Sequence, residues 1–228
     1  MKKQIPNIIT LLNLFSGCIA IVMAFKGNFP AAVIWIMLAA AFDFCDGLAA
    51  RSLGVSSKMG VELDSLADVV SFGVAPASAV FILLQDFTFF PSFLSQLKPF
   101  LPYLAFLIPI FSAYRLAKFN IDDRQTTSFL GLPTPANGLF WITYVYGTHL
   151  QAGTNGFYFY LTIGFILVLS LLMISEIPMF SLKIKSLKLK GNEKQLLLIV
   201  LMIAFVSLWG ILGVAWGVLA YIVLSVIR

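Results

Sequence analysis

The sequence predicts an all-α integral membrane protein, and three features lead to this prediction. Apolar residues fill 60% of the 228 positions, while charged residues fill only 11%, well below the roughly 25% of an ordinary soluble domain. The apolar residues gather in eight long runs, and 22 of them are Phe. No polar stretch is long enough to fold alone, so we expect a single membrane domain.

Eight apolar runs predict eight membrane helices. A helix needs about 20 apolar residues to cross the hydrocarbon core, and the first six runs approach that length. They predict a six-helix core within residues 1–180. The last two runs are short, and they predict either a hairpin over residues 195–228 or one long helix bent at Gly210. The approximate bounds are 8–25, 30–50, 63–85, 99–119, 134–151, 157–176, 195–209 and 211–227.

The distribution of Lys and Arg predicts the orientation of these helices. With a cytoplasmic N-terminus and alternating spans, only Lys26 and Lys98 fall outside, whereas twelve basic residues fall inside. Cytoplasmic loops carry such an excess of positive charge, so we expect the N-terminus and the basic loop 181–194 to face the cytoplasm from the inner cell membrane. The inner residues are Lys2, Lys3, Arg51, Lys58, Arg115, Lys118, Arg124, Lys183, Lys185, Lys188, Lys190 and Lys194.

Acidic residues gather at one place, where the second and third apolar runs meet. Asp43 and Asp46 share one face of the second predicted helix, and Asp64 and Asp68 share one face of the third, because residues three or four apart lie on one side of a helix. The loop between the helices is short, so the helices should be antiparallel neighbours. We therefore expect the four carboxylates to converge just below the inner membrane surface.

Four clustered carboxylates repel one another unless cations lie among them. Oxygen ligands without Cys or His favour hard ions such as Mg²⁺, Mn²⁺ or Ca²⁺, and two divalent ions would balance four carboxylates. Such a pair of ions is a common clamp for phosphoryl chemistry. Gly47 and Ala50 leave space on the same helix face, while Arg51 and Lys58 offer positive charge to a diphosphate.

Carboxylates inside membrane helices have a second interpretation, a cation or proton pathway. A pathway needs acidic residues across the whole bilayer, yet the outer halves of the predicted helices carry almost none. A purely structural membrane scaffold gives no reason for the ordered spacing of Asp and Arg. We therefore favour an enzyme over a transporter or a scaffold.

The acidic segment resembles the signature of the CDP-alcohol phosphatidyltransferase family, D-x-x-D-G-x-x-A-R-x8-G-x3-D-x3-D. The eight matching residues are Asp43, Asp46, Gly47, Ala50, Arg51, Gly60, Asp64 and Asp68. The resemblance implies a six-helix core, usually in a homodimer, and two divalent cations (Mg²⁺ or Mn²⁺) held by the four Asp. It also implies that Asp68 is the catalytic base. The CDP group would be held by Asp46, Gly47, Ala50, Arg51, Gly60 and Asp64.

Three further stretches resemble the branch of the family that uses serine. They are Leu63–Pro76, Tyr114–Asn120 and Phe129–Gly138. This resemblance implies that CDP-diacylglycerol donates its phosphatidyl group to L-serine. We expect the protein to contact membrane lipid and not to bind nucleic acid. An ether CDP-lipid, or another acceptor such as glycerol phosphate or inositol phosphate, remains open, although a phosphorylated acceptor needs a denser basic pocket.

Serine must be held by its charged ends. Arg115 and Lys118 lie three residues apart at the cytoplasmic end of the fourth predicted helix, so they share a face at the right depth. The alternative is that both side chains only extend to lipid phosphates. Weaker candidates for polar contacts with serine are Ser71, Asn120, Thr134 and Asn137.

Overall fold

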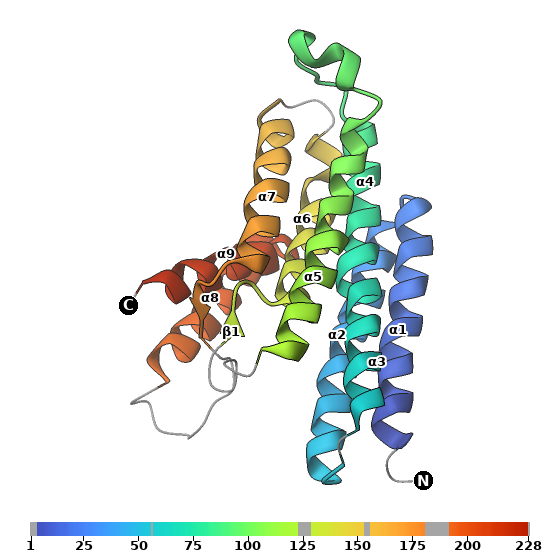
Figure 1. Cartoon of the computed structure of the whole chain (residues 1–228). Helices are drawn as coiled ribbons and strands as arrows, with labels where there is room; N and C mark the ends of the chain where they lie inside the picture. Colours follow the sequence, from blue (N-terminus) through green and yellow to red (C-terminus); the bar gives the residue numbers. More distant parts are fainter. Residues whose placement is uncertain (1–3, 56, 123–128, 153–155, 181–191, 228) are drawn as a thin grey trace.

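Long apolar helices stand side by side in the computed structural model, which describes residues 4–55, 57–122, 129–152, 156–180 and 192–227 (Figure 1). The expected all-α fold is confirmed. The helices are α1 (Gln4–Phe25), α2 (Phe29–Ser52), α3 (Lys58–Asp68), α4 (Ala75–Asp86), α5 (Leu107–Ile121), α6 (Thr134–Ala152), α7 (Gly156–Ile174), α8 (Glu193–Trp209) and α9 (Leu212–Val226).

Shorter elements join some of these helices. A π-helical segment, η1 (Val69–Val74), links α3 to α4 without a break, so these three elements form one rod over residues 58–86. Two 3₁₀ helices, η2 (Ser92–Leu97) and η3 (Leu101–Phe106), lie between α4 and α5. Two very short strands, β1 (Phe129–Leu130) and β2 (Pro178–Met179), pair in antiparallel fashion.

Five of the described helical stretches are long and apolar enough to cross a membrane, which makes the chain a multi-pass membrane protein. They are 4–25, 29–52, 58–86, 101–121 and 156–174. They coincide with five of the six runs expected for the core. The sixth run is α6, a 19-residue helix in the middle of the bundle whose polar residues Asn137, Thr143 and Thr148 are buried.

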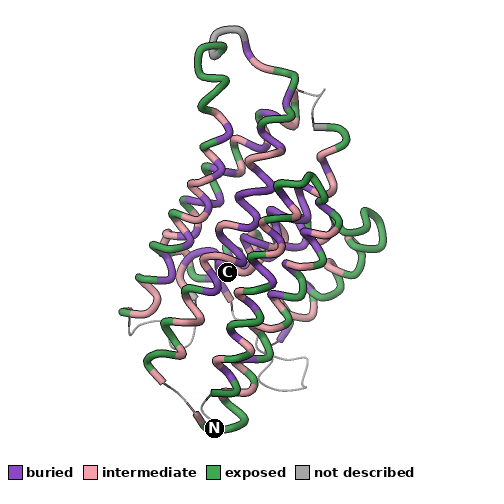
Figure 2. Tube along the Cα trace, turned by 90° about the vertical axis from the view of Figure 1, so that its right-hand side faces the viewer, coloured by how far each residue is buried: buried purple, intermediate pink, exposed green. Residues whose placement is uncertain are grey.

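Small and polar residues, rather than large apolar ones, line the inner face of α1. Its buried residues include Thr10, Asn13, Gly17, Ala20 and Ala24, which recur at helical spacing, while large side chains such as Phe15 point outward. Figure 2 shows buried positions along the inside of the bundle and exposed ones along its outside. In a bilayer, helices associate through small residues that let backbones approach closely. Small residues inside and large apolar residues outside, the reverse of a soluble protein, therefore suit a bundle covered by lipid.

The two C-terminal helices form an antiparallel hairpin, not one bent helix. The Lys194 ammonium group, at the start of α8, donates to the carbonyl of Leu224 at 2.9 Å and to that of Ile227, both at the end of α9. The chain turns at Gly210. At about 1.5 Å per residue, α8 (17 residues) and α9 (15 residues) are about 25 and 22 Å long, short of the roughly 30 Å hydrocarbon core.

Several basic residues used to predict the orientation lie outside the described residues. These are Lys2, Lys3, Arg124, Lys183, Lys185, Lys188 and Lys190. The greater part of the predicted basic loop 181–194 lies outside them as well. Cytoplasmic orientation therefore stays a prediction from the sequence.

Candidate active site

The loop between α2 and α3 brings the two acidic helices together. Gly54 has a φ of +62°, its N–H donates to the carbonyl of Arg51, and the N–H of Val55 donates to the carbonyl of Ala50. These two hydrogen bonds form a Schellman motif, which ends a helix sharply and favours Gly at the left-handed position. The hydroxyl of Ser57 then accepts from the N–H of Gly60 at 3.0 Å and begins α3.

Three carboxylates meet where α2 and α3 face each other. One oxygen atom each of Asp43, Asp64 and Asp68 lies within 4.8 Å of the others. Asp68 is buried, and Oδ1 of Asp64 is buried without a hydrogen-bond partner among the described residues. Like charges this close repel one another strongly in a low-dielectric environment. An all-oxygen donor set with an unsatisfied carboxylate oxygen fits a hard divalent cation.

Asp46 lies beside this group and is held by α1. Its Oδ2 accepts a hydrogen bond of 2.6 Å from the hydroxyl of Thr10, and the carboxylate is buried. The Thr10 hydroxyl is also 3.0 Å from the carbonyl of Pro6, but its single proton goes to the nearer, charged acceptor. Asp46 interacts electrostatically with Asp43 and Asp64. The carboxylates of α2 and α3 therefore converge as the sequence predicted, although Asp46 stands outside the tightest group and both helices pack against α1 rather than closely against each other.

A second residue of α1 reaches the acidic group. The side-chain amide of Asn13 donates to Oδ1 of Asp68 over 3.5 Å, and the side chain is fully buried. The sequence had assigned no role in the site to Thr10 or Asn13, although the opening stretch from Pro6 to Asn13 also resembles the family. The sequence does contain a pattern that could have pointed to them: Pro6, Thr10 and Asn13 recur at helical spacing, and two of them are polar within an apolar run.

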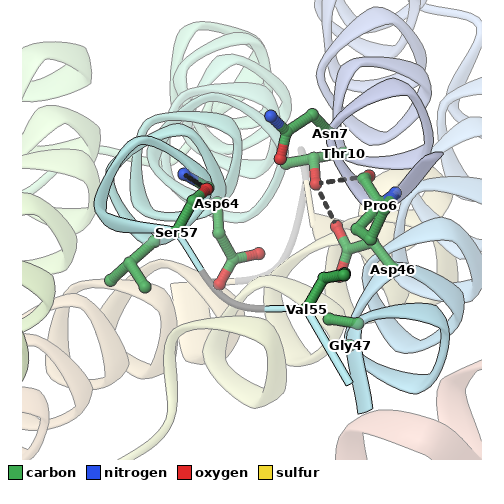
Figure 3. Close-up of a pocket in the computed structure, with 11 residues that line it drawn as sticks. Pro6, Asn7, Thr10, Asp46, Gly47, Val55, Ser57 and Asp64 are labelled. Carbon is green, nitrogen blue, oxygen red and sulfur yellow. Dashed lines mark hydrogen bonds between the residues drawn. The ribbon is translucent and has the colours of Figure 1, made fainter. Parts of the chain in front are cut away.

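A pocket of about 150 Å³ opens next to the carboxylates. Figure 3 shows Asp64 of α3 and Asp46 of α2 on opposite sides of it, with Asn7 and Thr10 of α1 on a third side. Gly47, Ala50 and Gly60 also line it. All three small residues that the signature places near the carboxylates therefore face one cavity, where their small size leaves room for a ligand.

The two basic residues near this pocket differ in position. A Cβ added to Gly47 would lie 3.3 Å from Nη1 of Arg51, so the guanidinium passes directly over that glycine. Arg51 also interacts electrostatically with Asp46. Lys58 begins α3 and is exposed. Arg51 is therefore the basic residue placed to interact with an anion in the pocket, on the side formed by α2.

Immediately after Asp68 the helix widens into η1, which three other helices approach closely. A Cβ on Gly17 of α1 would lie 2.4 Å from Oγ of Ser71, and one on Gly138 of α6 would lie 2.8 Å from Cα of Phe72. Gly73 in turn faces Pro109 of α5, with 3.2 Å left for a Cβ. Isolated π-helical turns occur frequently at functional sites. Here the turn sets the direction in which Asp68 and Ser71 leave the helix.

Arg115 of α5 is a buried cation on the far side of Asp68. Its side chain is 7% exposed, and its Nη1 donates to the hydroxyl of Thr134, at the start of α6, at 3.2 Å. The guanidinium carbon lies 5.8 Å from the ring centre of Phe119. Nε of Arg115 has no partner among the described residues. Arg115 interacts electrostatically with Asp68, so an unsatisfied positive group borders the acidic cluster.

The remaining residues predicted to contact serine make protein contacts instead. Lys118 forms an ion pair of 3.7 Å with Glu176, and the amide of Asn120 donates to the hydroxyl of Ser65 at 3.0 Å. The hydroxyl of Ser71 donates to the backbone carbonyl of Asn13 at 3.0 Å. The amide of Asn137 donates to Sδ of Met173 at 3.2 Å. These contacts tie the helices around the site to one another.

Fold and site together define a multi-pass membrane protein with a cluster of buried and half-buried carboxylates and an adjoining pocket at one end of its helical bundle. A family model described as CDP-alcohol phosphatidyltransferase matches residues 3–179. The chain belongs to this enzyme family.

Several relatives carry more specific names. A CDP-diacylglycerol–serine O-phosphatidyltransferase of Helicobacter pylori is 33% identical and covers 98% of this chain and 90% of its own length. A Bacillus subtilis protein of the same name is 37% identical over 77% of this chain and 89% of its own length. An archaetidylserine synthase of Methanothermobacter thermautotrophicus is 33% identical over 76% of this chain and 68% of its own length.

Proposed function

We propose that this protein is a CDP-diacylglycerol–serine O-phosphatidyltransferase, which makes phosphatidylserine and releases CMP. The observation that carries the proposal is the cluster of Asp43, Asp64 and Asp68 next to a pocket lined by the signature's small residues. The names of the Helicobacter and Bacillus relatives support the choice of acceptor.

The four signature Asp are the proposed ligands of two divalent cations, Mg²⁺ or Mn²⁺. Asp43, Asp64 and Asp68 have the close spacing that such ions need, and the unpartnered oxygen of Asp64 offers a ligand atom. Asp46, which lines the pocket, is the fourth proposed ligand. Cations bound there would neutralise the negative charge of a diphosphate, including the charge that develops on the leaving phosphate.

The CDP group is proposed to occupy the pocket between α1, α2 and α3. Gly47, Ala50 and Gly60 provide the space for its flat base and sugar, while Arg51 offers positive charge to the diphosphate. Asp46 and Asp64 lie at opposite sides of the same cavity (Figure 3). The lipid tails would then lie along the outside of the bundle, where the exposed side chains are large and apolar.

In the proposed reaction, Asp68 acts as the general base. It accepts the proton of the serine hydroxyl, and the serine oxygen forms a bond to the phosphorus of the phosphatidyl group. The bond from that phosphorus to CMP breaks, and CMP leaves with the electron pair. The hydrogen bond from Asn13 keeps the carboxylate of Asp68 oriented toward the cluster. No covalent intermediate with the protein is needed.

Arg115 is the proposed partner of the serine carboxylate. It is a buried cation next to Asp68 with an unsatisfied Nε, and a carboxylate is the natural acceptor for a guanidinium. Lys118, Asn120 and Ser71 would support the site through the contacts that fix α5 and η1.

The proposal includes an arrangement in the cell. The core of residues 1–180 would carry the reaction, with the N-terminus and the active site at the cytoplasmic face of the inner membrane, and the protein would act as a homodimer. The predicted basic loop 181–194 and the C-terminal hairpin 195–228 would follow the core. The charge asymmetry of the sequence supports this orientation.

One assay tests the function. Purified protein in detergent micelles is given CDP-diacylglycerol, Mn²⁺ or Mg²⁺, and one acceptor at a time from a panel of L-serine, glycerol phosphate, inositol phosphate and water, while CMP release is followed. Serine alone should give rapid release with formation of phosphatidylserine. Faster release with another acceptor would refute the proposed substrate. Replacing the donor by an ether CDP-lipid tests the alternative suggested by the archaeal relative.

A further inference from the structure

The C-terminal hairpin packs against the part of the core that leads to Arg115. It lies beyond residue 179, where the match to the family ends. Helix α9 packs along α6 and touches β2. A Cβ on Gly147 of α6 would lie 2.6 Å from Cβ of Leu212, so the two helix backbones are close at the end of α9 that follows the turn.

Tyr221 is the polar residue through which α9 holds the core. Its side chain is buried, and its hydroxyl donates to the carbonyl of Phe180 at 3.0 Å. Its ring packs against that of Phe180 with centres 5.0 Å apart. Phe180 directly follows β2, so this contact ties the hairpin to the strand pair.

The strand pair connects this contact to the start of α6. Phe129 and Leu130 of β1 pair with Met179 and Pro178 of β2. The N–H of Gly131 then donates to the carbonyl of Ile177 at 2.9 Å. A Cβ on Gly131, which has a φ of +73°, would lie 2.3 Å from the carbonyl oxygen of Met173, so only glycine fits this turn. Three residues later the chain reaches Thr134.

Thr134 holds the guanidinium of Arg115 by the hydrogen bond of 3.2 Å to Nη1. A buried, flexible cation needs such restraints to present its free Nε in one direction. Thr134 therefore restrains Arg115 directly. Tyr221 restrains it indirectly, because Phe180, the strand pair and the turn at Gly131 connect the hairpin to Thr134.

We propose that the C-terminal hairpin is a specificity element for the acceptor, in which Tyr221 is a positioning residue that holds Arg115 in place for the carboxylate of serine. This inference rests on the proposed function, because it assumes that Arg115 binds serine. It gives the hairpin a role in the reaction, although none of its residues lies among the signature residues.

Steady-state kinetics of the full-length protein test the inference. In Tyr221→Phe, the KM for serine should rise about three- to tenfold, the range that corresponds to one net hydrogen bond. The KM for CDP-diacylglycerol and kcat should stay within about twofold, because the metal cluster and pocket are untouched. Tyr144→Phe is the matched control, since Tyr144 is a buried tyrosine bonded to Thr162 at 2.9 Å and should change neither KM.

Arg115→Ala and the double variant separate the two proposals. Arg115→Ala should raise the serine KM more than Tyr221→Phe does, and the double variant should match Arg115→Ala, because Tyr221 acts through Arg115. An effect of Arg115→Ala without one of Tyr221→Phe would overturn the role of the hairpin and leave the proposed function standing. Multiplied effects in the double variant, or a loss confined to kcat, would also overturn it. An unchanged serine KM in Arg115→Ala would remove Arg115 from the serine site.

Discussion

The hydroxyl of Thr10 donates a 2.6 Å hydrogen bond to Oδ2 of Asp46, joining the first helix to the second beside the acidic cluster. Neither residue is close to the other in sequence, and both are buried. The bond holds Oδ2 of Asp46 against α1. It also fixes one wall of the pocket proposed for the CDP group.

Replacing Thr10 by Val should therefore weaken the donor site. Val keeps the shape but removes the hydroxyl, and a hydrogen bond to a charged group contributes about 1.5–3 kcal/mol. We expect the KM for CDP-diacylglycerol to rise about tenfold or more, with the KM for serine little changed. Thr143→Val is the control, because Thr143 is buried and, within the described part of the chain, its hydroxyl bonds only to carbonyls of its own helix. Equal kinetics for both variants would show that Thr10 does not support the pocket.

Removing divalent ions should stop the reaction. Excess chelator should abolish CMP release, and Mn²⁺ or Mg²⁺ should restore it. Bound ions should also stabilise the folded protein by about 2.7 kcal/mol at a hundredfold excess over Kd, which thermal unfolding can detect without any substrate. This stabilisation should shrink in Asp43→Asn and Asp64→Asn. Undiminished CMP release in chelator would end the metal proposal.

Asp68→Asn should separate catalysis from binding. The amide keeps the size of the side chain but cannot accept a proton, and general-base catalysis contributes about 10² to 10⁴ in rate. We expect kcat to fall by that factor, while metal-dependent binding of CDP-diacylglycerol remains measurable by calorimetry. Asp86→Asn, at the exposed end of α4, provides the control and should be fully active. Normal turnover in Asp68→Asn would exclude Asp68 as the base.

Two Gly→Ala changes should shift the free energy of unfolding in opposite directions. At Gly17 the new methyl group would lie 2.4 Å from Oγ and 2.7 Å from Cα of Ser71, so η1 must shift. Overpacking of this kind costs about 1–3 kcal/mol of unfolding free energy, and the shift should also lower kcat by moving Asp68. At Gly164 a Cβ meets nothing within 4 Å, and Ala should stabilise the helix by about 0.5–1 kcal/mol.

Thermal unfolding and kcat of both variants check this prediction. If Gly17→Ala were as stable and active as Gly164→Ala, the close contact between α1 and η1 would have no influence on Asp68. A loss of stability with full activity per folded molecule would limit the role of Gly17 to packing.

The sequence alone determined the helices and the signature. Each apolar run became a helix within a few residues, because a membrane leaves the backbone few alternatives to helical hydrogen bonding. The convergence of Asp43, Asp64 and Asp68 was also predictable, since helical spacing groups the Asp residues of each helix on one face and the short loop joins the two helices at that end. The hairpin, by contrast, was one of two possibilities until the contact from Lys194 to the end of α9 decided it.

Contacts between segments distant in sequence were decided only by the tertiary structure. The bond from Thr10 to Asp46, the bond from Arg115 to Thr134 and the contact of Tyr221 with Phe180 all join separate helices or loops. Periodicity shows which face of a helix a residue occupies, but not which neighbour that face meets. Packing of the helices against one another made that choice, and with it the arrangement of polar groups around the four carboxylates.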